Sequence, residues 1–283
     1  MTLLQVLILA AVQGAAELLP VSSSAHVIVT EKLMGLDPSS PEMTLLLVML
    51  HTGTMFAVIA YFWQTWRKTY FSSTQGFVAQ CRLLVAATMA TGAVGLTLQA
   101  LIKHFVMASD PNFEIEHLFA NTRLMAAALA SAGVLILYSS RQKEDGQAPL
   151  TQVRALVIGA VQGLCLPFRG FSRSGATIST GMAVGVNRQI AEEFSFAMAV
   201  VLTPAILIKE ALRLHHAQAS AIATHAHAAS FMSIWGISLI GMGASFVAGL
   251  LALRWLSSWL EQGRWHLFGF YCLFASAIVL LAG

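Results

Sequence analysis

Long apolar runs occupy most of the chain, and polar residues gather between them. Six runs approach the roughly 20 residues that a helix needs to cross a bilayer. They cover residues 43–63, 83–102, 119–138, 193–212, 230–253 and 265–282. The pattern therefore predicts an all-α polytopic membrane protein with six transmembrane helices.

Two other apolar stretches, residues 2–30 and 151–186, are interrupted midway by Gly, Pro and clustered Ser. Neither half of each stretch is long enough to cross the bilayer. Irregular backbone at membrane depth is tolerated only where it is buried in protein or lines a cavity. We therefore predict two re-entrant helical hairpins, each entering and leaving on the same side.

The order of elements predicts an inverted-topology repeat within a single membrane domain, residues 1–283. Each half has a hairpin followed by three spans, and an odd number of spans reverses the second half relative to the first. Repeat 1 covers about residues 1–140 and repeat 2 about residues 150–283. At a constant offset of 149 residues, Gln13 pairs with Gln162 and Gly14 with Gly163.

The composition supports this interpretation. Hydrophobic residues make up 57% of the chain and charged residues only 10%, with a mean hydropathy of +0.72. A soluble domain usually has about 25% charged residues. The net charge of +3 is too small and too dispersed for nucleic-acid binding. The three cysteines (Cys81, Cys165 and Cys272) lack metal-ligand spacing and are predicted to be unpaired packing residues.

The loop charges predict the orientation. The loops at 64–82, 139–154, 187–192 and 254–264 carry nine Lys and Arg residues, whereas the opposite side carries five. The positive-inside rule places the first set in the cytoplasm. Both termini and the open end of the first hairpin are then periplasmic, and the second hairpin opens to the cytoplasm.

The first hairpin contains Glu17 and His26 in apolar surroundings. An ionisable group at membrane depth is costly and indicates function, although a structural polar pair at a broken helix is the alternative. Ser22, Ser23 and Ser24 lie where the second half-helix begins. They can cap that helix, and a helix N-terminus also binds phosphate.

The second hairpin contains Gly-Phe-Ser-Arg-Ser-Gly-Ala-Thr at residues 170–177. Arg173 offers a bidentate fork to phosphate oxygens, and Arg169 adds a second positive charge. The hydroxyl and glycine residues expected to contact phosphate oxygens are Ser172, Ser174, Gly175 and Thr177. The two hairpins together therefore predict one site for a phosphate ester.

Other histidines are weaker candidates. His51 lies within a span beside Thr52 and Gly53, where a satisfied core histidine is a better interpretation than a ligand. Four more fall in an Ala-rich loop where solvation is expected, with adventitious metal binding as the alternative: His215, His216, His225 and His227.

Both hairpin motifs resemble those of the undecaprenyl-pyrophosphate phosphatase family, the bacitracin-resistance type of bacterial inner-membrane enzyme. The similar segments are QGAAELLPVSSSAH at residues 13–26 and GFSRSGATIS at residues 170–179. The resemblance covers the whole chain in length and span order. It implies an inverted repeat, a C55 isoprenyl pyrophosphate substrate, hydrolysis to the monophosphate carrier of cell-wall synthesis, and a divalent cation, Mg²⁺ or Ca²⁺.

Four positions depart from the family pattern. The family has Glu where this chain has Gln13, Pro where it has Arg169, and Thr-Gly where it has Ser24-Ala25. Two carboxylates four residues apart share a helix face and can bind a cation together. Here Glu17 and the neutral amide of Gln13 are the expected metal ligands. The departures indicate a divergent paralogue with slower hydrolysis, another lipid pyrophosphate as substrate, or lost chemistry.

The resemblance and the residue types suggest a mechanism. Ser23 attacks the terminal phosphorus, and His26, three residues later on a neighbouring helical turn, is its activating base. Glu17 holds the cation, and Arg173 neutralises developing charge. A second hypothesis has His26 activate water or itself become phosphorylated, and the sequence leaves both open.

A transporter or flippase of a prenyl-phosphate lipid is the competing function, because half-helix N-termini aimed at an anion also occur in secondary transporters. Gln13 favours that interpretation, whereas Glu17, Ser23, His26 and Arg173 favour hydrolysis. Small residues at 86–97 and 126–133 permit either close helix packing within the chain or a homodimer face.

Overall fold

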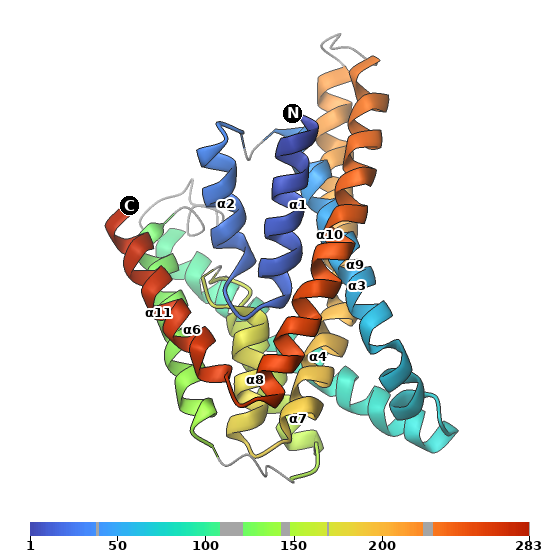
Figure 1. Cartoon of the computed structure of the whole chain (residues 1–283), viewed down its shortest axis with the longest axis vertical. Helices are drawn as coiled ribbons and strands as arrows, with labels where there is room; N and C mark the ends of the chain where they lie inside the picture. Colours follow the sequence, from blue (N-terminus) through green and yellow to red (C-terminus); the bar gives the residue numbers. More distant parts are fainter. Residues whose placement is uncertain (38–39, 108–120, 143–147, 169, 223–228, 283) are drawn as a thin grey trace.

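The computed structural model describes residues 1–283 except 38–39, 108–120, 143–147, 169, 223–228 and 283 (Figure 1). The described residues form α-helices, with one isolated bridge between Ala148 and Val186. The helices are α1 Leu3–Leu18, α2 Ser23–Leu33, α3 Pro41–Tyr70, α4 Thr74–Met107, α6 Thr122–Ser140, α7 Gln152–Leu164, α8 Arg173–Ala183, α9 Arg188–Ile222, α10 Ala229–Glu261 and α11 Trp265–Ala282. The all-α prediction is confirmed.

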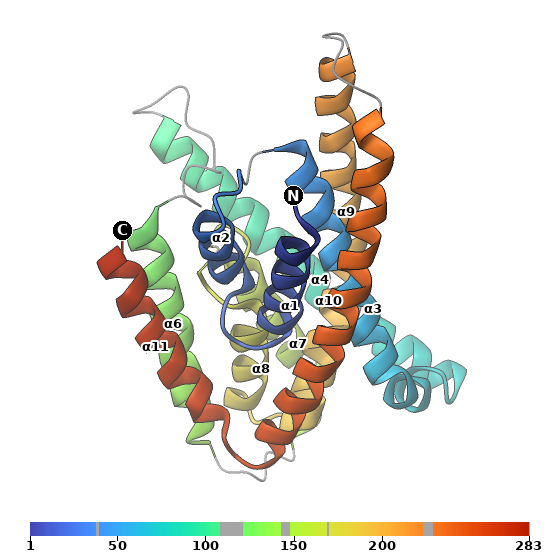
Figure 2. The same ribbon diagram turned by 45° about the horizontal axis from the view of Figure 1, so that its top comes forward.

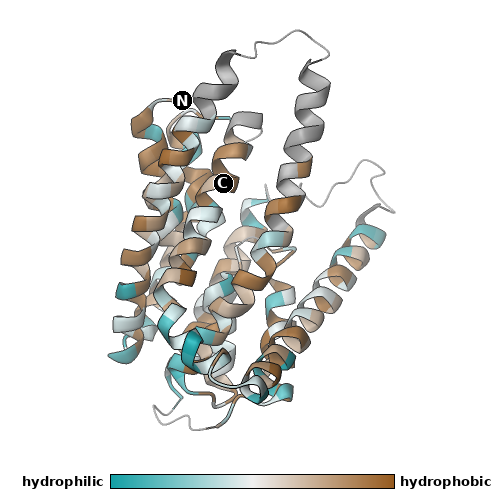
Figure 3. Ribbon diagram, turned by 90° about the vertical axis from the view of Figure 1, so that its right-hand side faces the viewer, coloured by the Kyte–Doolittle hydropathy of each residue, from teal (hydrophilic) through white to brown (hydrophobic). Residues whose placement is uncertain are grey.

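Four described helices are long and apolar enough to cross a membrane. They are Met43–Tyr70 in α3, Thr74–Phe105 in α4, Thr122–Ser140 in α6 and Trp235–Glu261 in α10. Each contains or closely overlaps one of the predicted spans. The two remaining predicted spans correspond to α9 and α11, and α11 is a shorter apolar helix. In Figure 3 hydrophobic residues recur along the length of the helices, as expected for a helical membrane protein.

The two interrupted stretches form the helix pairs α1–α2 and α7–α8. Helix α1 ends at Leu18, because Leu19 precedes Pro20 and adopts an extended conformation. Helix α8 begins at Arg173, where the Ser172 hydroxyl accepts the backbone N–H of Gly175 at 3.3 Å. In Figure 1 the α1–α2 pair opens toward the end that holds the N-terminus, and the α7–α8 pair opens toward the opposite end. Their tips approach each other midway along the molecule.

The helix pairs lie between α6 and α11 on one side and α3, α9 and α10 on the other (Figure 2). Glycines permit the closest approaches. A Cβ added to Gly14 in α1 would lie 2.6 Å from the Ala248 Cβ in α10, and one added to Gly163 in α7 would lie 2.8 Å from the Val94 Cβ in α4. A Cβ on Gly133 in α6 would lie 2.9 Å from a carbonyl oxygen of α11. Small residues in 86–97 and 126–133 therefore serve packing within the chain.

Candidate functional site

The Glu17 carboxylate lies where the tips of the two hairpins meet. Its Oε2 accepts hydrogen bonds from the Ser23 hydroxyl at 2.6 Å and the Gln13 amide at 3.3 Å. Its Oε1 accepts one from Nη2 of Arg173 at 3.1 Å. The Glu17 side chain is 19% exposed, so substrate can reach a carboxylate that is otherwise enclosed. The structure thus brings together four predicted site residues from both hairpins.

Arg173 retains hydrogen-bonding capacity beyond its ion pair with Glu17. The side chain is 24% exposed, and its Nη1 is buried without a hydrogen-bond acceptor among the described residues. An unpaired guanidinium N–H costs free energy unless a ligand accepts from it. Phosphate oxygens suit the planar guanidinium fork. Arg173 is therefore arranged to bind an anion beside Glu17 and Ser23.

The N-termini of two half-helices also meet at this point. Ser23 is the first residue of α2 and Arg173 is the first residue of α8. The N-terminal end of a helix carries partial positive charge and binds phosphate readily. Ser22, just before α2, has φ +66°, a left-handed conformation that is costly for a residue with a Cβ. Ser22 is buried and Ser24 is half-buried, and neither occupies the first position of α2.

His26 is oriented by hydrogen bonds at both ring nitrogens. Its Nδ1 lies 2.8 Å from the Ser22 carbonyl oxygen, and its Nε2 lies 2.5 Å from the Tyr271 hydroxyl of α11. Ser23 donates to Glu17 instead of His26. The structure therefore shows Glu17, and not the activating base His26 suggested by the sequence, as the acceptor of the Ser23 hydroxyl.

His51 is a site residue that sequence analysis missed. Its Nε2 lies 3.7 Å from Oε2 of Glu17, and its side chain is 39% exposed. Its Nδ1 donates to the Leu47 carbonyl at 2.8 Å, which directs Nε2 toward Glu17. The histidine is satisfied at Nδ1 as expected, but the packing of α3 beside α1 leaves its side chain partly exposed and turns Nε2 toward Glu17.

Three predicted phosphate-binding hydroxyls already have protein partners. The Ser174 hydroxyl donates to the Leu19 carbonyl at 3.1 Å and so joins the two hairpin tips. Thr177 is fully buried, donates to the Arg173 carbonyl at 2.8 Å and contacts the Ser195 hydroxyl at 2.5 Å. The Ser172 hydroxyl caps α8. In this arrangement all three hydroxyls hold the start of α8 and hence Arg173.

The two remaining predicted positions are Gly175 and Arg169. Gly175 packs beside the first hairpin, where an added Cβ would lie 3.1 Å from the Pro20 Cβ. Its backbone N–H is taken by the Ser172 hydroxyl. Gly175 therefore allows the two hairpin tips to approach closely. Arg169 lies outside the described residues, as do the histidines at 225 and 227.

The described residues contain no group of three or more His, Cys, Asp or Glu side chains that could hold a metal ion. Glu17 offers carboxylate oxygens, and Gln13 offers an amide oxygen on the same helix face. Mg²⁺ is commonly bound by one or two carboxylates while phosphates and water fill its other positions. Both Glu17 oxygens accept hydrogen bonds from protein donors, so a cation at this point would need phosphate oxygens of the substrate among its ligands.

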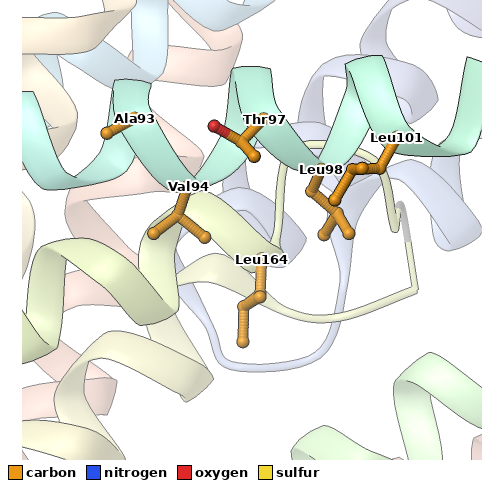
Figure 4. Close-up of a pocket in the computed structure, with 6 residues that line it drawn as sticks. All are labelled: Ala93, Val94, Thr97, Leu98, Leu101 and Leu164. Atoms are coloured by element: carbon orange, nitrogen blue, oxygen red, sulfur yellow. The ribbon is translucent and has the colours of Figure 1, made fainter.

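An apolar groove lies beside the tip of the second hairpin (Figure 4). It has a volume of about 410 Å³ and is lined by Ala93, Val94, Thr97, Leu98, Leu101 and Leu164. Leu164 ends α7, so the groove adjoins the hairpin whose second helix begins at Arg173. The groove is thus suited to a hydrocarbon chain near the anion-binding residues.

Comparison with known proteins shows which protein family has a similar sequence. Residues 6–278 match the family described as bacitracin resistance protein BacA. The chain is 62% identical to "Undecaprenyl-diphosphatase 2" of Acinetobacter baylyi over 99% of this chain and 98% of that protein. It is 30% identical to "Undecaprenyl-diphosphatase" of Korarchaeum cryptofilum, covering 99% of both chains. It is 33% identical to the protein of that name in Gluconacetobacter diazotrophicus, covering 98% of this chain and 96% of that protein.

Proposed function

We propose that this chain, which belongs to the BacA family of bacitracin resistance proteins, hydrolyses undecaprenyl pyrophosphate to undecaprenyl phosphate and inorganic phosphate. The product is the lipid carrier that cell-wall synthesis uses again. The observation that carries this proposal is the Ser23–Glu17–Arg173 arrangement, in which a hydroxyl nucleophile lies beside a guanidinium with a free N–H. The names of the relatives support the same reaction.

In the first step, the Ser23 Oγ attacks the terminal phosphorus of the pyrophosphate. Its proton passes to Oε2 of Glu17, which already accepts the Ser23 hydrogen bond at 2.6 Å. The bond between that phosphorus and the bridging oxygen breaks, and undecaprenyl phosphate leaves with the electron pair. Arg173 and the N-terminus of α8 stabilise the negative charge on the transferred group.

In the second step, water attacks the phosphorus of the phosphoserine. Nε2 of His26, the nitrogen that does not donate to the Ser22 carbonyl, takes the Tyr271 hydroxyl proton, and the Tyr271 oxygen takes the proton of this water in exchange. The bond between phosphorus and the Ser23 Oγ breaks, and Glu17 returns its proton to Ser23. Direct attack by water or by His26 on the pyrophosphate is the alternative, and the activity of Ser23→Ala separates the two.

A divalent cation fits the site together with the substrate. Glu17 and the amide oxygen of Gln13 would hold it, and when bound it would neutralise part of the pyrophosphate charge. Replacing Gln13 by Glu is expected to lower the Mg²⁺ concentration for half-maximal activity about tenfold, because ligand charge tunes cation affinity. An unchanged Mg²⁺ titration in Gln13→Glu would exclude this position as a ligand.

The groove lined by α4 and Leu164 is the proposed site for the first part of the prenyl chain. It is apolar, it lies beside the hairpin that carries Arg173, and most of α4 is exposed toward the surrounding lipid. A short, soluble prenyl pyrophosphate would bury less apolar surface in the groove and in the lipid beside it. Its KM is therefore expected to exceed that of undecaprenyl pyrophosphate in the same assay.

The inverted-topology repeat is supported by how the two halves pack on each other. Gly14 in α1 and Gly163 in α7 are 149 residues apart and belong to equivalent hairpins. Gly14 lies close to three residues of α10: Ser245, Ala248 and Gly249. Gly163 lies close to three residues of α4: Thr91, Val94 and Gly95. Each α4 residue precedes the corresponding α10 residue by 154 positions. Each hairpin therefore uses equivalent positions to pack on the other half.

The proposed location is the bacterial inner membrane, with both termini in the periplasm. A cysteine introduced at Thr2 is expected to react with a membrane-impermeant maleimide in cells whose outer membrane is permeabilised. A cysteine at Gln142, in a loop rich in positive charge, is expected to react only after cell disruption. Labelling of the unsubstituted chain gives the background reaction of its own three cysteines. The reverse pattern would overturn this orientation.

Phosphate release from undecaprenyl pyrophosphate by the purified protein in detergent tests the function. Release is expected with Mg²⁺ and is expected to be lost with EDTA and in Glu17→Gln. Glu261→Gln, at the exposed end of α10, is the matched control and should keep full activity. Absence of release from folded protein that still binds the lipid would favour a flippase or another pyrophosphate substrate.

A further inference from the structure

We propose that Tyr271 holds the His26 imidazole in its reactive tautomer and orientation and relays the proton of the attacking water to it. Its hydroxyl lies 2.5 Å from Nε2 of His26, and the two rings stack with centroids 5.8 Å apart and an interplanar angle of 18°. The two residues are 245 positions apart in the chain. The catalytic part of this inference rests on the proposed hydrolysis.

The hydrogen bonds of His26 define which nitrogen carries the proton. The Ser22 carbonyl oxygen can only accept a hydrogen bond, so Nδ1 must donate to it. The lone pair of the neutral imidazole is then on Nε2, and the Tyr271 hydroxyl donates to it. The positive φ of Ser22 is part of the backbone turn that carries this carbonyl. His26 is thus held at both nitrogens, by its own hairpin and by α11.

The position of Tyr271 is secured by its neighbours in α11. The thiol of Cys272 donates to the Pro20 carbonyl at the tip of the first hairpin, at 3.0 Å. The indole of Trp265 donates to the Ser179 hydroxyl of α8 at 3.0 Å. Helix α11 is therefore hydrogen-bonded to both hairpins, and these bonds fix the position of Tyr271 relative to His26.

A tyrosine hydroxyl suits both protonation states of the imidazole. It donates to the neutral ring, passes its proton to Nε2 as its oxygen takes the proton of the water, and then accepts from Nε2–H. The contact therefore persists while the proton is transferred. A phenylalanine keeps the stacked ring and removes only this hydroxyl.

The first measurement is the rate at which diethyl pyrocarbonate modifies His26 in the folded protein without substrate, followed by peptide mass spectrometry. The reagent needs a free imidazole lone pair. Tyr271→Phe is expected to raise the rate about fivefold, because a net hydrogen bond of ordinary strength is lost. Tyr138→Phe, an exposed tyrosine of α6, is the control, and the His51 rate is an internal reference. An unchanged His26 rate would overturn the proposed contact.

The second measurement is steady-state hydrolysis. Tyr271→Phe is expected to lower kcat about tenfold and to leave KM unchanged, because outer-shell partners of an imidazole typically contribute this much. An unchanged kcat would overturn the positioning role even if the labelling rate rises. A wild-type protein without phosphatase activity would overturn the proposed function instead, and the labelling arm would still decide whether Tyr271 holds His26.

Discussion

Arg173→Ala is expected to lower kcat/KM for undecaprenyl pyrophosphate by about 10³-fold, because arginine groups that stabilise a transferring phosphoryl group contribute on this scale. Arg173 donates to Glu17 through Nη2, and its Nη1 has no acceptor among the described residues. The substitution removes both the phosphate donor and the partner of the Glu17 carboxylate. Phosphate release in detergent, measured over a range of substrate concentrations, separates the loss in kcat from the change in KM.

Two variants control for the loss of Arg173. Arg173→Lys keeps the positive charge but not the planar fork, so it should recover only part of the activity. Arg141→Ala removes an exposed arginine at the end of α6 and should leave the rate unchanged. Full activity in Arg173→Ala would show that another group neutralises the pyrophosphate and would remove the central support for the proposed site.

Ser23→Ala is expected to abolish measurable turnover, with a loss of about 10⁴-fold or more, because removing a nucleophile eliminates the covalent route. The Ser23 hydroxyl donates to Glu17 at 2.6 Å and begins α2, so both a base and a helix N-terminus lie beside it. Rapid acid quenching of the wild-type reaction followed by mass spectrometry should detect phosphoserine at this position.

The Ser23 experiment also decides between the two mechanisms. Substantial remaining activity in Ser23→Ala, together with modification of His26 or no covalent intermediate, would favour direct attack by His26 or by water activated by it. Ser131→Ala is a matched control, since this exposed serine of α6 donates only to the Ala127 carbonyl of its own helix. Its activity should equal that of the wild-type protein.

Much of the architecture follows from local sequence patterns. Apolar runs long enough to cross a bilayer became α3, α4, α6 and α10, because lipid requires every backbone polar group to be satisfied within the helix. Pro20 and the Ser–Gly clusters interrupt the hairpins where the sequence indicated. The proximity of Gln13 to Glu17 also follows from their spacing of four residues in α1.

The roles of individual polar residues were less accessible from the sequence. The motif around Arg173 suggested several phosphate-binding hydroxyls, but Ser174 and Thr177 bind the Leu19 carbonyl and Ser195 in the structure. A hydroxyl suits a ligand and a buried protein partner equally well. Which one it meets depends on the rotation of α8 against its neighbours, and no local pattern records that rotation.

The sequence by itself determined that this is a helical membrane protein with two broken hairpins and reactive residues at their tips, because helix length and helix interruption depend on neighbouring residues. Only the tertiary structure decided that Arg173 pairs with Glu17 across 156 positions, that His51 faces this pair and that Tyr271 holds His26. Such contacts depend on how helices are rotated and how closely they approach. Those quantities are set by many small packing contacts, including those of Gly14 and Gly163, rather than by any single segment.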